Sequence, residues 1–95
     1  MPVAVLYLHL SLPGCLSLKE KRGRIKPLLA RLHREFNGSI VEYDRLDAWN
    51  EAVVACAVIS NDAVQCRRVL QSVTEYTSLN FRDVEVLDQQ IEILS

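Results

Sequence analysis

Five basic side chains lie within eight consecutive positions near the start of the chain. They are Lys19, Lys21, Arg22, Arg24 and Lys26. Ammonium and guanidinium groups bind phosphates, and the free backbone amides of a helix start attract the same anions. The group therefore predicts contact with RNA phosphates. Because no aromatic residue is interleaved with these cations, we expect little readout of base sequence. The alternative interpretation is an ordinary solvated face of a helix.

The charge of this segment differs from that of the remaining chain. The protein has 95 residues and a formal net charge of -1. Residues 17–36 contain seven basic and two acidic residues, whereas the rest of the chain contains four basic and ten acidic residues. Such asymmetry in a nearly neutral protein favours an anionic partner for the basic segment.

Residue types that commonly perform catalysis are few and scattered. His9 and His33 are far apart in the sequence, and neither has a nucleophile beside it. Cys15 has only Lys19 nearby to activate its thiol. The sequence therefore predicts a protein that is not an enzyme. A deep pocket that joins His9 to carboxylates would be needed to support catalysis.

Three carboxylates surround the single tryptophan of the chain. Asp44, Asp47 and Glu51 lie close to Trp49 in the sequence, but they lack the alternating oxygen ligands and the glycine of a calcium loop. We expect these carboxylates to solvate or cap a loop, and we predict no metal and no other cofactor. Trp49 is expected to plug the end of the core or to lie in an interface rather than to stack on a ligand.

Length and composition indicate one domain, residues 1–95, in a cytoplasmic protein. Three cysteines, Cys15, Cys56 and Cys66, cannot all pair within one chain, and none has the spacing of a zinc or redox motif. This usage indicates reduced thiols. The N-terminal segment lacks the basic start of a signal peptide and is interrupted by polar residues and proline, so we expect no membrane segment.

Hydrophobic periodicity predicts a strand and a helix in the first part of the chain. Residues 3–12 alternate between an apolar set and a mixed set, which is typical of a strand with one buried face. Residues 17–36 have a helical period, with a capping box formed by Ser17 and Glu20, and Asn37-Gly38 is the expected stop. Pro27 either bends one continuous helix, which we favour, or begins the helix after a separate turn.

Lys21 falls on the apolar side of this predicted helix. We expect its long side chain to extend past the sheet edge into solvent.

The second part of the chain predicts two further strands, a helix and a last strand. Residues 39–43 are short and favour a strand, and residues 52–59 are apolar on both faces, as in a central strand. Asp62 and Gln65 predict a capping box for the second helix. The apolar parity changes within residues 84–94, which predicts a strand with a bulge.

This order of elements predicts an α+β protein with the ferredoxin-like βαββαβ sandwich. Right-handed crossovers give a four-stranded antiparallel sheet in the order 4-1-3-2, with two helices on one face. The other face is open and apolar, so we expect it to be covered. We predict that this face and the tryptophan in the connection between the second and third strands form an interface. Its residues are Val3, Val5, Tyr7, His9 and Trp49.

Several segments resemble the YlxP-like family of small bacterial proteins. The first is the run SLKEKR at residues 17–22, after a strand and Pro-Gly; the others are Leu46-Asp47-Ala48-Trp49 and Ser60-Asn61-Asp62. The resemblance implies a ferredoxin-like fold and an uncharacterised function. Genes of this family are often found beside those for translation initiation and ribosome-binding factors, which implies association with RNA or the ribosome.

Two functional hypotheses follow from these observations. The first is a non-catalytic RNA- or ribosome-associated module that contacts phosphates through the basic start of its first helix. The second is a self-associating or regulatory protein-interaction domain that buries the open sheet face, with a homo-oligomer as one form of it.

Overall fold

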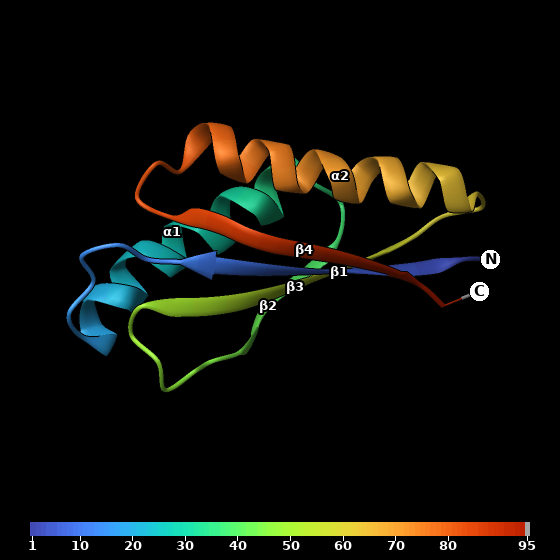
Figure 1. The fold of residues 1–95 in the computed structure, drawn as a ribbon. Helices are drawn as coiled ribbons and strands as arrows, with labels where there is room; N and C mark the ends of the chain where they lie inside the picture. The colour runs from blue at the N-terminus through green and yellow to red at the C-terminus, as the bar shows by residue number, and fades with distance from the viewer. Residues whose placement is uncertain (95) are drawn as a thin grey trace.

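The computed structural model describes residues 1–94 and contains four strands and two helices within that range. In chain order they are β1 (Val3–Ser11), α1 (Leu18–Glu35), β2 (Ser39–Asp44), β3 (Glu51–Ile59), α2 (Ala63–Asn80) and β4 (Glu85–Ile93). The sheet is antiparallel with the order β2-β3-β1-β4, which is the predicted order read from the other edge. Both helices lie on one side of the sheet (Figure 1). The prediction of a ferredoxin-like α+β fold is confirmed.

The core lies between the sheet and the two helices. Side chains of β1 are alternately buried and half-buried, as the sequence period predicts. Leu6 of β1 is opposite Cys56 of β3, so the buried residues of both central strands face the same side. Burial of apolar side chains such as these contributes roughly 25 cal/mol per Å² of surface removed from water. The helices contribute Ile25, Leu28, Leu32, Cys66, Leu70 and Val73 to this core.

Helix α1 begins with the predicted serine cap. The backbone amide of Glu20 donates to Ser17 Oγ at 3.1 Å, whereas the Glu20 carboxylate accepts from the amide of Leu16 at 2.6 Å, one residue before the position expected. Pro27 lies inside a single helix, so the alternative with a separate first turn is wrong. None of the helices within residues 1–94 is long and apolar enough to cross a membrane.

The end of α1 differs from the expected glycine cap. Phe36 has an extended backbone, with φ -127° and ψ 141°, and its amide donates to Leu32 O. Gly38 is required for another reason, because a Cβ atom there would lie 2.9 Å from the backbone oxygen of Ala57. Only glycine therefore lets the chain enter β2 so close to β3.

The later elements also follow the sequence pattern. Asp62 caps α2 by accepting from the amide of Val64 at 2.9 Å, but within the described chain Gln65 forms no reciprocal bond, so the predicted capping box is only half formed. In β4 the register shifts between Val86 and Asp88, which leaves Leu87 as an extra residue with 53% of its surface exposed. The predicted bulge is confirmed.

Candidate nucleic-acid interface

Three of the five predicted phosphate ligands lie on one exposed face of α1. Lys19, Arg22 and Lys26 are all exposed, and their spacing of three and four residues places them in a row along the helix. None of the three forms an ion pair with another residue between positions 1 and 94. We call this row the α1 basic stripe.

Arg24 has a structural role in the fold. Its Nη1 atom donates to the backbone oxygen of Pro13 at 2.8 Å and to that of Asp83 at 3.0 Å. These two bonds connect the turn after β1 with the turn before β4. The guanidinium is therefore partly occupied, and Arg24 is a weaker phosphate ligand than the sequence indicates.

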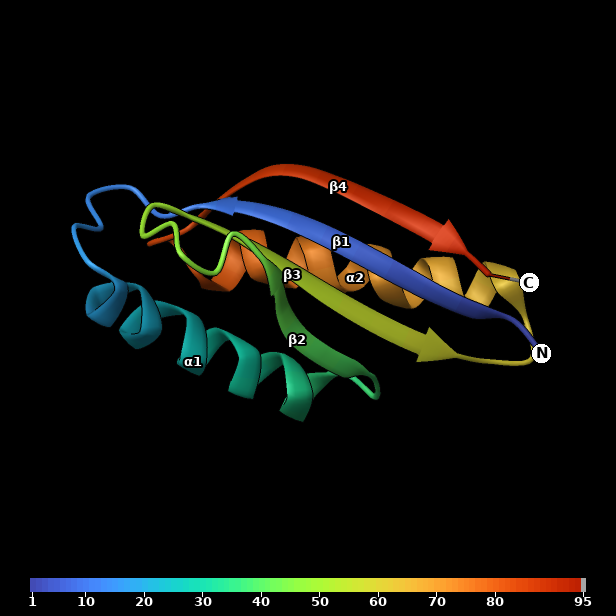
Figure 2. The same ribbon diagram turned by 90° about the horizontal axis from the view of Figure 1, so that it is seen from below.

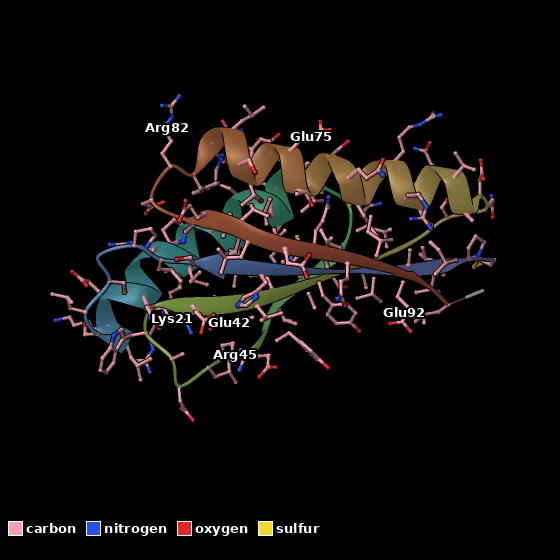
Figure 3. All side chains as sticks on the ribbon, viewed as in Figure 1. Lys21, Glu42, Arg45, Glu75, Arg82 and Glu92 are labelled. Atoms are coloured by element: carbon pink, nitrogen blue, oxygen red, sulfur yellow. The ribbon has the colours of Figure 1, made fainter. Side chains whose placement is uncertain are left out.

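Lys21 is buried, with 2% of its surface exposed. Its ammonium donates to the backbone oxygens of Arg45 and Ala48, both at 2.7 Å, and lies 2.8 Å from Glu42 Oε2 (Figure 3). That carboxylate oxygen is buried and has no further hydrogen-bond partner among the described residues. This corrects the expectation that the Lys21 side chain extends into solvent. Lys21 holds the β2–β3 connection and does not face a phosphate.

The N-terminal end of α1 is also partly occupied. The Ser17 hydroxyl and the Glu20 carboxylate already bind amides there. A carboxylate in the first turn interacts favourably with the positive end of the helix dipole and repels a second anion. Attraction of phosphate to the helix start is therefore weaker than the sequence suggested. The α1 basic stripe is the main site that the geometry offers to an anion.

The connection between β2 and β3, residues 45–50, lies beside the first turns of α1 (Figures 1 and 2). Trp49 in this loop is 51% exposed, so the expectation that it plugs the end of the core is wrong. Arg45 adopts a left-handed backbone with φ 62° at the start of the loop, where the Asp44 carboxylate accepts from its amide at 2.7 Å.

The open sheet face is apolar along its centre. Register pairs Val5 with Ala57 and Tyr7 with Ala55, and these half-buried residues alternate with the buried ones that face the helices. They therefore lie on the sheet face that is turned away from the helices, the face nearer the viewer in Figure 2. The Tyr7 and Tyr43 rings lie 5.2 Å apart between centroids. On the β4 side the same face is polar and acidic, because Gln90, Asp88 and Glu92 are opposite Tyr7, His9 and Val5. Of the predicted interface residues, Val3, Val5, Tyr7 and His9 share this face, whereas Trp49 lies in the loop at one end.

Residues 3–91 match the family described as "Protein of unknown function (DUF503)". The chain belongs to this family. Over 69 residues it is 36% identical to the uncharacterized protein YlxP of Bacillus subtilis (strain 168), a match that covers 73% of this chain and 74% of that protein. The resemblance to YlxP-like proteins is therefore confirmed.

Solved structures similar to this DUF503 chain support its fold. The de novo designed protein Foldit4 has a TM-score of 0.51 at 17% identity, covering 100% of this chain and 98% of the designed chain. Rv0793 from Mycobacterium tuberculosis has a TM-score of 0.52 at 20% identity, with 100% and 94% of the two chains covered. At these identities the likeness concerns the fold alone.

His9 of this DUF503 chain has one carboxylate within hydrogen-bond distance and a second acidic residue opposite it on β4. Its Nε2 atom lies 2.9 Å from Glu51 Oε1, and Asp88 is its register partner on β4. The hollow that Tyr7, His9 and Asp88 help to line has a volume of about 160 Å³. Pockets that bind small molecules usually measure roughly 300–1,000 Å³. The hollow is therefore too small to enclose a substrate away from water.

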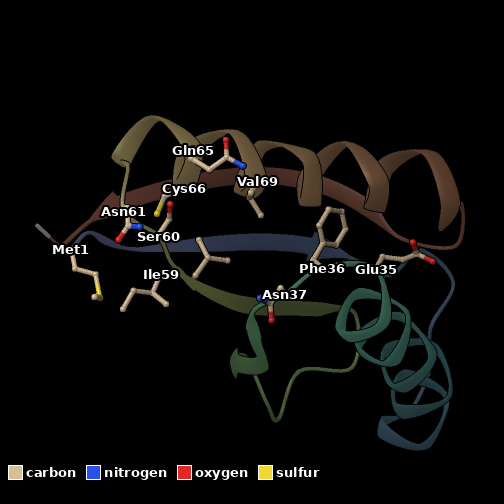
Figure 4. Close-up of a pocket in the computed structure, with 11 residues that line it drawn as sticks. Met1, Glu35, Phe36, Asn37, Ile59, Ser60, Asn61, Gln65, Cys66 and Val69 are labelled. Carbon is tan, nitrogen blue, oxygen red and sulfur yellow. The ribbon is translucent and has the colours of Figure 1, made fainter.

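A larger cavity of about 650 Å³ lies at the C-terminal end of α1. It is bounded by Phe36, the end of β3 and the first turns of α2 (Figure 4). Apolar side chains such as Val58 and Val69 line it together with the amides of Asn61 and Gln65. Glu35 is at its edge, and the negative charge of this residue disfavours a phosphate there. This cavity contains none of the predicted site residues.

The thiols of this DUF503 chain are shielded from solvent. Cys15, Cys56 and Cys66 are all free and buried. Burial raises the pKa of the Cys56 thiol to about 11, so this group stays protonated at neutral pH.

Proposed function

We propose that this protein is a non-catalytic module that binds RNA, free or within the ribosome, by contacting phosphates through the α1 basic stripe. The observation that carries the proposal is the shared exposed face of Lys19, Arg22 and Lys26, with none of them neutralised by an ion pair among the described residues. Three such cations provide an electrostatic contact that does not depend on base sequence. The free, buried cysteines support a cytoplasmic location for this activity.

The distribution of acidic residues supports RNA binding at α1 rather than on the open sheet face. Asp88 and Glu92 line the β4 side of the open sheet face, and Glu51 lies beside His9 on the same face. Carboxylates at these positions repel a polyanion. RNA is therefore directed to α1 rather than to the sheet, which distinguishes this module from domains that stack bases on their sheet.

The salt dependence of RNA binding tests the number of phosphate contacts. Three contacts with a single strand predict a slope of about -2 for the logarithm of affinity against the logarithm of salt concentration. Fluorescence anisotropy of a labelled oligouridine, measured at several salt concentrations, gives this slope. A slope near zero, or no binding at low salt, would contradict the proposal.

Self-association through the open sheet face is a second candidate, favoured by the exposed apolar side chains there. Val41 is 55% exposed, Tyr43 57% and Ile59 62%, and they surround the half-buried Val5 and Tyr7. An apolar patch spread over several strands is unusual on a monomer. A two-fold symmetric pair of copies would bury the same patch on both partners.

We expect Tyr43→Glu to weaken this association at least about tenfold, because it would place a charge inside a desolvated contact. Sedimentation equilibrium at micromolar protein concentration measures the change. Val64→Glu is the control, because Val64 is 61% exposed on α2, away from the sheet face. If the unmodified chain sediments only as a monomer, this candidate is rejected.

A further inference from the structure

Trp49 is an exposed aromatic residue held in a fixed loop. The backbone oxygen of Ala48, directly before it, accepts from Lys21 Nζ at 2.7 Å. The backbone oxygen of Asn50, directly after it, accepts from the amide of Leu12 at 2.9 Å. The backbone on both sides of Trp49 is thus anchored, to α1 and to the residue that follows β1, while 51% of the Trp49 surface faces solvent. A preorganised aromatic surface of this kind binds a planar partner at low entropic cost.

The loop is joined to the helix that carries the α1 basic stripe. Lys21 belongs to the same turns of α1 as Lys19 and Arg22, and its ammonium bonds to both Arg45 and Ala48 of the loop. In two perpendicular views the loop lies against the first turns of that helix (Figures 1 and 2). The backbone next to Trp49 is therefore bonded to the helix that carries the cations, although the sequence separates Trp49 from them by more than twenty residues.

The charges of the loop select what Trp49 can contact. Asp44 and Asp47 are both exposed close to it, and they disfavour a phosphate at this position. An uncharged base meets no such repulsion, and its flat face matches an indole ring. Leu46, which is 58% exposed, extends the apolar surface of the loop. The loop thus suits a base, while the α1 basic stripe suits the phosphates.

We propose that Trp49 stacks on an unpaired base of an RNA strand whose phosphates contact the α1 basic stripe. The inference rests on the proposed RNA binding and names its ligand class: single-stranded RNA, in preference to duplex. Bases in a duplex are stacked on each other and cannot be received by the indole ring.

Intrinsic fluorescence tests the inference directly, because Trp49 is the single tryptophan of the chain. An oligouridine of about ten nucleotides should quench this fluorescence on binding, since stacking brings the base into contact with the ring. An RNA duplex of similar length should bind without comparable quenching. Anisotropy of the labelled RNA gives the affinities.

Substitutions separate stacking from electrostatics. Trp49→Ala should weaken binding of the oligouridine about tenfold and leave duplex binding within about twofold, whereas Trp49→Phe should retain most of the affinity. Val64→Ala, which removes another exposed apolar side chain in the first turn of α2, should change neither affinity. Circular dichroism verifies that each variant is folded.

The outcomes distinguish base stacking by Trp49 from the proposed RNA binding through the α1 basic stripe. If oligouridine binds the unmodified chain without quenching its fluorescence, and Trp49→Ala binds it as tightly, stacking is refuted and phosphate binding stands. If neither RNA binds at low salt, both fail. Quenching by the single strand together with the selective loss in Trp49→Ala supports both.

Discussion

Lys21→Met should reduce the free energy of unfolding by about 2–3 kcal/mol, because the substitution leaves a buried carboxylate without its counter-charge. Glu42 Oε2 lies 2.8 Å from the Lys21 ammonium and is shielded from solvent. The two backbone oxygens that Lys21 binds, those of Arg45 and Ala48, also lose their donor. We place the effect just below the range of roughly 3–5 kcal/mol for fully buried pairs because the Glu42 side chain keeps 21% of its surface exposed.

Urea unfolding followed by circular dichroism measures this loss. Lys19→Met is the matched control, since Lys19 is exposed two residues away and should alter stability by less than about 0.5 kcal/mol. The double variant Lys21→Met, Glu42→Leu should recover part of the loss because no charge is then left buried. A Lys21→Met protein as stable as the Lys19→Met control would show that the ion pair does not hold the β2–β3 connection.

Local periodicity was sufficient to predict the fold. Alternation in β1 identifies which side chains face the helices, because one-residue shifts would expose every leucine of the strand. The change of parity near Leu87 identifies the bulge in β4 for the same reason. Serine at position 17 and aspartate at position 62 mark the starts of both helices through their capping bonds.

The candidate site was only partly predictable, because it depends on contacts between distant segments. Lys21 and Arg24 look like surface cations in the sequence, but their partners lie in turns that only the tertiary structure brings near. The position of Lys21 on the apolar side of the helical wheel was the available signal for its burial. The neighbourhood of Trp49 could not be predicted, since it depends on a bond between α1 and a loop 27 residues away.

The residues of the open sheet face were also only partly predictable from the sequence. Its β1 half follows from the alternation of that strand, whereas Val41, Tyr43 and Ile59 join it through strand pairing and were not predicted. Apolar residues on both parities of β3 were the one signal, and they were interpreted as a central strand. β3 is central, between β2 and β1, and the apolar residues of its second parity lie on the open face.

Arg22→Glu, Lys26→Glu should greatly weaken RNA binding. If the electrostatic contribution vanishes near 1 M salt, each phosphate contact on a single strand is worth a factor of about 8 at about 50 mM salt. Loss of two contacts then predicts roughly a 60-fold loss of affinity, and reversal of the charges adds repulsion. Both side chains are exposed and outside the core, so the fold should tolerate the change.

Arg67→Glu, Arg68→Glu provides the matched control. It lowers the formal net charge by the same amount, and both arginines are exposed in the first half of α2. That half of α2 lies at the other end of the molecule from the first turns of α1 (Figure 1). The pair of variants therefore separates a local phosphate contact from the effect of net charge.

The most direct test is the affinity of these two variants and the unmodified chain for one labelled oligouridine at about 50 mM salt. We predict that the α1 variant loses roughly 60-fold, whereas the α2 variant stays within about threefold of the unmodified chain. Equal losses in both variants, or no loss in the α1 variant, would contradict the assignment of the α1 basic stripe as the site that binds RNA.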